Sequence, residues 1–325
     1  MSVLLCTYNG SEHLSEQIKS YFAQSHWNWS LHVSDDGSTD GTLEILAELR
    51  RTTARVVDIE VVAGPGRGAT PNFLSLICRN DVHDGYVALS DQDDIWLSHK
   101  LERAVAALEA VPEDVPAVYG SRTRVVDRGL RPIRLSPLFR RQPSFRNALV
   151  QNIAGGNTLV LNAAARRLVV AAGPDQDVVS HDWWIYLLVT GHGGRFIYDP
   201  EPGLLYRQHG RNLVGHNRSL RGLVKRFRSL HRGRYWRLIG DNLRALERSG
   251  RLLSPENRRL VAEFRALMEG PALAKPLAFH RLGLHRQAPV ETGLLHLGLL
   301  TGRSGHPGAP GVPEPEPLDG RRRLT

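Results

Sequence analysis

The first 120 residues alternate between two hydrophobic periods, each typical of a different secondary structure. Short apolar runs of strand length are followed by segments whose apolar residues lie three and four positions apart, which is the helical spacing. The apolar runs predict strands at 3–7, 31–33, 56–62, 86–90 and 117–119, and the helical spacing predicts helices at 12–24, 40–49, from about 71, and at 98–110. Strands that alternate with helices through short connections indicate a mostly parallel sheet with helices on both faces. We therefore expect an α/β fold.

The rest of the chain is less regular. Residues 121–150 are rich in Arg and Pro and predict an irregular loop. We expect strands at 155–161 and 195–198, helices at 163–172 and from about 181, and mostly helix over 218–268. The Gly- and Pro-rich segment 302–325 cannot bury enough apolar surface to order itself. The predicted organisation is an α/β domain over 1–215, with halves at 1–120 and 121–215, a basic helical extension over 216–301 and a disordered tail over 302–325.

Composition narrows the class of protein. Hydrophobic residues make up 41% and charged residues 23%, as in soluble globular proteins. No run of about 18 apolar residues is present, so no transmembrane helix is expected. The N-terminal segment VLLCTYNG predicts a core strand rather than a signal peptide. Cys6 and Cys78 both lie in apolar segments, which suits a reducing compartment. We expect a cytoplasmic protein, with peripheral contact to the inner face of the membrane as an open alternative.

The charge is distributed unevenly. Residues 1–200 carry a net charge of −4 and residues 201–325 carry +13, which together give +9. Within 218–237, apolar residues recur at helical spacing and five Lys and Arg residues share the remaining surface. Such a helix could lie on an anionic bilayer, or it could pack on the main domain with a solvated basic face. No aromatic-interleaved basic motif or zinc spacing indicates a nucleic-acid partner.

The segment SDQDDIW at 90–96 carries the strongest chemical signal. Asp91, Asp93 and Asp94 follow a predicted buried strand within four positions. Like charges this close repel unless a cation lies among them, and Mg²⁺ or Mn²⁺ bound through oxygen atoms commonly also holds substrate phosphates. The alternative interpretation is a solvated acidic turn.

Two other polar clusters also follow predicted strands, at 7–9 and at 35–36. Ligands of such sheets bind at the carboxyl ends of the strands, so the three clusters predict one site. No G-x-x-x-x-G-K-[ST] sequence is present, which argues against a P-loop. The glycine-rich segment 64–68 predicts a flexible loop.

Six motifs occur in one order: CTYNG at 6–10, SDDGSTDGT at 34–42, Asn72-Phe73, SDQDDIW at 90–96, HDWW at 181–184 and YRQHGRN at 206–212. Over roughly residues 2–215 the chain resembles the inverting nucleotide-sugar glycosyltransferases of glycosyltransferase family 2, above all the rhamnosyltransferase-type members. The resemblance implies a GT-A type fold, a nucleotide-sugar half at 1–120 and an acceptor half at 121–215.

The resemblance also implies roles for individual residues. Asp182 matches the general base, and Asp93 matches the direct metal ligand of the Asp-X-Asp motif, with Mg²⁺ or Mn²⁺ as cofactor. His209 falls where fold relatives supply a further metal ligand. The implied nucleotide-binding residues are Thr7, Tyr8, Asn9, Asp36, Asn72 and Asp91. Trp183 and Trp184 are candidates to stack on the acceptor sugar, or are packed in the core.

Two departures from the family pattern bear on function. Thr70-Pro71-Asn72 stands where many members carry Ala-Arg-Asn, so a diphosphate-contacting Arg is missing. A Gln-X-X-Arg-Trp motif of processive members is also missing, which favours transfer of a single sugar. We expect metal-dependent transfer of one sugar, with rhamnose favoured, from a nucleotide-diphosphate donor to a hydroxyl of a glycan or lipid-linked glycan. The alternatives are an inactive nucleotide-sugar-binding module and a nucleotidyltransferase.

Overall fold

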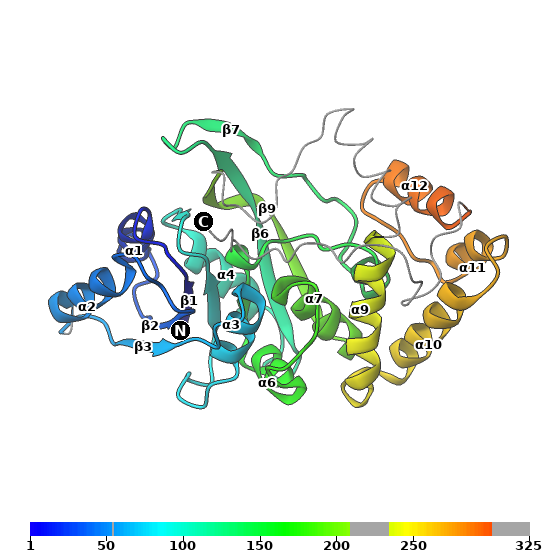
Figure 1. Cartoon of the computed structure of the whole chain (residues 1–325), viewed down its shortest axis with the longest axis horizontal. Helices are drawn as coiled ribbons and strands as arrows, with labels where there is room; N and C mark the ends of the chain where they lie inside the picture. Colours follow the sequence, from blue (N-terminus) through cyan, green and yellow to red (C-terminus); the bar gives the residue numbers. More distant parts are fainter. Residues whose placement is uncertain (54, 209–233, 301–325) are drawn as a thin grey trace, which may run out of the picture.

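The computed structural model describes residues 1–53, 55–208 and 234–300. Its centre is one mixed sheet with the strand order β3-β2-β1-β4-β8-β6-β9-β5, and β7 pairs with β6 (Figure 1). The strands are β1 Ser2–Thr7, β2 Ser30–Asp35, β3 Ile59–Ala63, β4 Val87–Ser90, β5 Ile95–Trp96, β6 Ala117–Val126, β7 Pro132–Leu135, β8 Val160–Leu161 and β9 Arg195–Arg207.

Helices cover both faces of the sheet, as expected. They are α1 Leu14–Phe22, α2 Thr42–Thr53, α3 Ala69–Ile77, α4 Lys100–Glu109, α5 Phe145–Ala148, α6 Ala163–Ala172 and α7 His181–His192. Alternate residues of β1 belong to different cores, because successive side chains of a strand point to opposite faces. Val3 and Leu5 pack with α1, α2 and α4, whereas Leu4 and Cys6 pack with α3, α6 and α7.

The first four strands of the sheet order, β3, β2, β1 and β4, are parallel, as the alternation of elements predicted. The second half differs from the prediction in two respects. The two-residue β8 lies antiparallel between β4 and β6. The predicted loop at 121–150 begins as a hairpin, because β6 continues to Val126 and pairs with β7. Strand β9 is also longer than predicted and pairs along β6 from Arg195 to Arg207.

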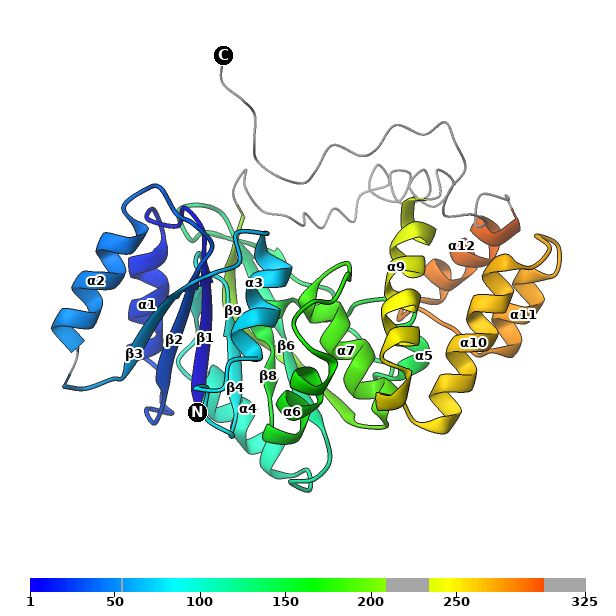
Figure 2. The same cartoon turned by 60° about the horizontal axis from the view of Figure 1, so that its bottom comes forward.

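Helices α9 Arg234–Arg248, α10 Pro255–Glu269, α11 Lys275–Arg281 and α12 Pro289–Leu300 form the end of the molecule opposite α1 and α2 (Figures 1 and 2). Trp236, Ile239 and Leu243 of α9 belong to the same buried core as α7. The helical extension therefore packs directly on the α/β domain. Most of the basic segment 218–237 and the whole tail 302–325 lie outside the described residues.

Candidate active site

Three strands bring the predicted polar clusters to one edge of the sheet. In the parallel register, Thr7 at the end of β1 is paired with Asp35 at the end of β2, and Leu5 is paired with Ser90 at the end of β4. The segments at 7–9, 35–36 and 91–94 therefore leave the sheet side by side, as the sequence predicted. Parallel strands bind ligands at this edge.

The acidic turn between β4 and β5 is electrostatically strained. Burial raises the pKa of Asp91 to about 7, and the negative charges of Asp93 and Asp182 raise it further in that direction. Asp182 belongs to α7, so its influence on Asp91 shows that the start of this helix lies close to the acidic turn. A divalent cation with oxygen ligands would relieve this repulsion, and carboxylates are the ligands that Mg²⁺ and Mn²⁺ prefer.

The residues that the structure describes do not by themselves complete a metal centre. Within 1–53, 55–208 and 234–300, no three Asp, Glu, His or Cys side chains are grouped so that they could hold an ion. His209, the predicted further ligand, lies outside the described residues. The chemistry of Asp91 and Asp93 fits a cation, and the complete ligand set stays a prediction.

Asp182 is fixed at the beginning of α7. The Ser180 hydroxyl and the Trp183 backbone N–H (2.7 Å) both donate to its Oδ1 atom. A helix N-terminus also stabilises a negative charge. Among the described residues no hydrogen bond to Oδ2 is present, so this oxygen is available to a ligand. The neighbouring His181 ring stacks on Phe73 at 4.1 Å, and burial lowers the pKa of this imidazole.

Asp94 has a structural role beside these acids. Its side chain is 1% exposed and accepts hydrogen bonds from the Asn157 amide and, at 3.3 Å, from the Arg207 backbone N–H. Burial and the charges of Asp93 and Asp91 raise the pKa of Asp94 well above its usual range. These contacts tie the acidic turn to the end of β9.

Sequence reasoning missed Arg207, which organises the acidic turn. Its guanidinium is buried; Nε donates to the Asp93 carbonyl at 3.1 Å, Nη1 to the Arg128 carbonyl at 2.7 Å, and Nη2 to the Glu16 carboxylate at 2.5 Å. One side chain thus joins α1, the turn after β6 and the backbone of the predicted metal ligand. The motif YRQHG contains this residue, but only the longer strand β9 reveals its position.

We expect Arg207→Lys to weaken metal binding as well as the fold. A lysine ammonium cannot reproduce three bonds from a planar guanidinium. The concentration of Mn²⁺ that gives half-maximal activity should rise about tenfold, which corresponds to about 1.4 kcal/mol. The matched control is Arg166→Lys, another buried arginine, which bonds the carbonyls of Ile77 and Arg79 on the far side of α3. If both variants lose stability but neither changes the Mn²⁺ requirement, Arg207 has only a structural role.

The nucleotide side of the site is built around Asp36. Its two carboxylate oxygens accept the backbone N–H groups of Gly66 and Gly68, both at 2.7 Å. These glycines have φ angles of +67° and +92°, which side chains disfavour. A Cβ atom on Gly64 would lie 2.8 Å from Asp36 Oδ1. The loop that the sequence predicted as flexible is therefore fastened to Asp36.

The β1 end is held by its own hydrogen bonds. Thr7 Oγ1 donates to Asp35 Oδ2 at 2.7 Å, and Asn9 Oδ1 accepts from the Thr39 N–H at 2.8 Å. The Tyr8 backbone exchanges two 2.9 Å bonds with the Gln92 amide, while its ring is 54% exposed. Tyr8 is thus the one of these three predicted nucleotide contacts whose side chain is open to a ligand.

Three predicted contacts have structural surroundings instead. Asn72 is buried, and its amide bonds the Ser34 hydroxyl at 2.5 Å and the Ser34 carbonyl at 3.0 Å, so it joins α3 to β2. Trp184 is 0% exposed, and Trp183 is buried with Nε1 bonded to the Ala148 carbonyl at 2.7 Å. The structure does not support stacking of these tryptophans on an acceptor, because α7 buries them in the core.

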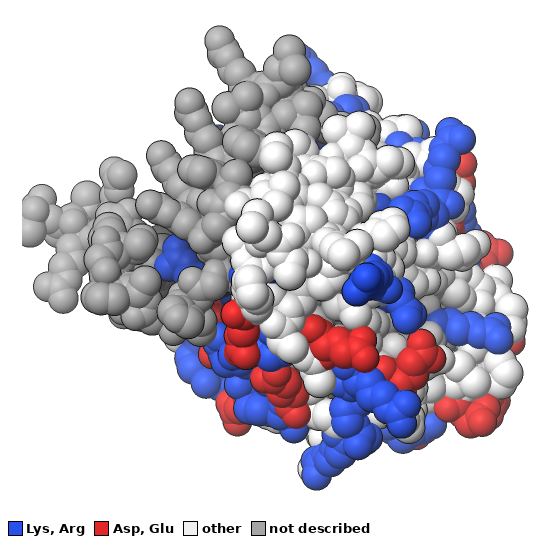
Figure 3. Space-filling view, turned by 90° about the vertical axis from the view of Figure 1, so that its right-hand side faces the viewer, with Lys and Arg blue, Asp and Glu red and all other residues white. Residues whose placement is uncertain are grey.

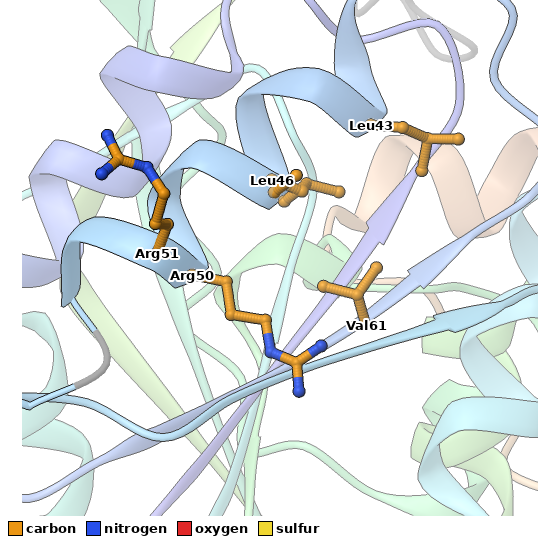
Figure 4. A pocket seen from close by; sticks show the side chains of 6 residues that line it. Leu43, Leu46, Arg50, Arg51 and Val61 are labelled. Atoms are coloured by element: carbon orange, nitrogen blue, oxygen red, sulfur yellow. The ribbon is translucent and has the colours of Figure 1, made fainter.

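A hollow of about 480 Å³ lies away from these residues, between α2 and β3. It is lined by Leu43, Leu46, Ala47, Arg50, Arg51 and Val61, and Figure 4 shows the Arg50 side chain reaching toward the strand while Arg51 points away. Arg51 is paired with Glu48 at 2.7 Å. None of these residues belongs to the strand-end site.

The raised pKa of Asp91 predicts how pH affects the metal-free protein. The folded state keeps a proton on Asp91 up to about pH 7, whereas the unfolded chain releases it near pH 4, so stability falls as pH rises between these values. Asp91→Asn should remove this contribution and raise the free energy of unfolding at pH 8 by about 1–3 kcal/mol, with little effect at pH 4. Urea unfolding in EDTA across this range measures the difference. Asp114→Asn, at the opposite end of the sheet, is the control, and equal pH slopes in all three proteins would contradict the prediction.

Comparison with known proteins adds an independent result. Residues 2–169 match the family model described as Glycosyl transferase family 2. The dTDP-rhamnosyl transferase RfbG of Shigella flexneri is 30% identical over 245 residues, which cover 72% of this chain and 81% of that protein.

Two solved structures have a similar fold. S. aureus TarS 1-349 in complex with UDP-GlcNAc gives a TM-score of 0.54 at 14% identity, covering 93% of this chain and 88% of that one. GalNAc-T7 with UDP, GalNAc and Mn²⁺ gives 0.50 at 13% identity, covering 72% and 50%. The likeness confirms the expected GT-A type fold.

Proposed function

Because this chain belongs to glycosyl transferase family 2 and is a glycosyltransferase, we propose that it transfers a single sugar from a nucleotide-diphosphate donor with inversion. The observation that carries this proposal is the closeness of the acid on α7 to the acidic turn after β4, expressed in the pKa of Asp91. One end of the site offers carboxylates to a cation and the other offers a carboxylate to an acceptor.

The acceptor hydroxyl must lose its proton as it attacks the sugar, so a base must lie within hydrogen-bond reach. Asp182 suits this role, because the bonds to Oδ1 fix its orientation and leave Oδ2 for the acceptor. The buried, uncharged ring of His181 keeps a competing proton donor away from this carboxylate. Attack from the side of Asp182 inverts the anomeric centre.

We assign Asp93, Asp91 and His209 to a site for Mg²⁺ or Mn²⁺. When bound, the ion neutralises the charge that develops on the departing diphosphate. Arg207 and Asp94 hold the backbone of this turn in place. The Mn²⁺ in the GalNAc-T7 structure, which shares the fold, supports the choice of a divalent ion.

For the donor, Asp36 and the exposed Tyr8 ring are the groups we expect to meet the ribose and base, with Thr7, Asn9 and Asn72 supporting them. The printed activity of RfbG favours dTDP-rhamnose as donor. The acceptor is a hydroxyl of a glycan or lipid-linked glycan.

A thermal-shift panel of nucleotide sugars with Mn²⁺ tests the donor. Selective binding to the folded state raises the melting temperature, and ligand at 100 times its Kd adds about 2.7 kcal/mol. We expect the largest shift with dTDP-rhamnose, loss of that shift in EDTA, and no comparable shift with ATP. Transfer to an acceptor then separates an active enzyme from a nucleotide-sugar-binding module, and release of a nucleoside diphosphate separates it from a nucleotidyltransferase. If no nucleotide sugar stabilises the protein, the proposal is wrong.

A further inference from the structure

The two last described helices expose an unusual amount of apolar surface. Leu273 and Leu277, at the start of α11, are 87% and 56% exposed. On α12, Val290, Leu297 and Leu300 are 71%, 46% and 46% exposed. We call these five residues the α11–α12 face.

The exposed residues of α12 occupy one side of the helix. Positions 290, 297 and 300 are separated by seven and three residues, which places them on the same side. The opposite side is already packed, because Leu295 and Leu299 are 1% and 0% exposed and lie in the main core. A surface helix of a globular protein normally carries polar residues on its outer side. The packing of this molecule therefore does not account for the outer leucines.

The charges around this face have one sign. Over 271–300 the chain has three basic residues, Lys275, Arg281 and Arg286, and a single acid, Glu291. Glu291 is paired with Arg286 at 3.0 Å, whereas Arg281 is exposed. Figure 3 shows this end of the molecule as a broad area of uncharged residues, with Lys and Arg beside it and Asp and Glu gathered in the lower part of the view.

We infer that the α11–α12 face docks on the surface of an anionic lipid bilayer. Aliphatic side chains enter the boundary between headgroups and acyl chains, and nearby cations meet the anionic headgroups. A second copy fits less well, because a two-fold contact would place Arg281 against its own equivalent with no unpaired acid on the face to offset it. No helix among the described residues is long and apolar enough to cross a membrane, so the contact is interfacial.

Flotation of the full chain with vesicles tests this inference without donor or acceptor, so its outcome is independent of the proposed transfer reaction. We expect binding to vesicles of 30% phosphatidylglycerol in phosphatidylcholine, weaker binding to pure phosphatidylcholine, and release as salt rises. The double variant Leu273→Glu, Leu297→Glu should bind at least tenfold more weakly. The matched control is Val56→Glu, at an apolar residue 77% exposed near β3.

Each result decides the question. Loss of flotation in the double variant alone, with an unchanged melting temperature, supports the inference. Equal flotation of all variants would assign membrane contact to another segment and overturn it. Absence of flotation in the unmodified chain would also overturn it, as would a concentration-dependent dimer that the double variant abolishes without any lipid binding.

Discussion

Asp182→Asn is expected to reduce the rate of sugar transfer by roughly 10²–10⁴-fold, the usual contribution of a positioned general base. Asparagine has the same shape and can still accept at Oδ1 from Ser180 and the Trp183 N–H, but it cannot take a proton from the acceptor. Donor binding should therefore survive. Initial rates over a range of acceptor concentrations, together with the donor-induced rise in melting temperature, measure the two effects separately.

The control for this variant is Asp177→Asn, which changes an exposed carboxylate five residues before the site. It should leave transfer unchanged. If Asp182→Asn retained normal turnover, another group would have to act as base. If it lost donor binding as well as turnover, Asp182 would serve the donor side and not the acceptor.

Asp93→Ala is the second large effect. Removing the proposed direct ligand should lower turnover by about 10³-fold or more, since metal ions supply several kcal/mol of charge stabilisation and each 1.36 kcal/mol is tenfold in rate. It should also abolish the rise in melting temperature that Mn²⁺ gives with donor. The measurement is transfer rate as a function of Mn²⁺ concentration.

Asp114→Ala removes an exposed acid at the other end of the sheet and should keep the full response to Mn²⁺. Removal of Asp93 also relieves the repulsion that raises the pKa of Asp91, so the metal-free variant should be at least as stable as the unmodified chain above pH 7. A variant that is merely unfolded would therefore be recognised. Full Mn²⁺-dependent turnover by Asp93→Ala would show that the ion is held elsewhere.

Local pattern was enough to predict the first half of the fold. Strands buried on both faces read as continuous apolar runs, and each is followed by a helix whose apolar side matches one face of the sheet. The second half depends on partners far along the chain. Strand β8 has only two residues, and its place between β4 and β6 is set by tertiary contacts that no local period encodes. The hairpin of β6 and β7 was hidden by arginines and prolines that also occur in loops.

The same distinction holds for the site. The acids at 91–94 and at 182 could be found because their residue types and positions after predicted elements restrict their chemistry. The tryptophans could not be assigned, because α7 is buried on nearly all sides and its sequence has no polar face to show which side meets a ligand. Arg207 was missed because its importance lies in what it joins, and three of its partners come from distant segments.

The division of β1 between two cores limits how chains with this architecture can change in length. One residue inserted between Val3 and Cys6 would exchange the layers in which the following side chains lie and would turn Thr7 away from Asp35. Insertions after the strand ends, where the chain already leaves the sheet, carry no such penalty. Gaps in an alignment of related chains therefore belong in the loops around the site and not in the strands that support it.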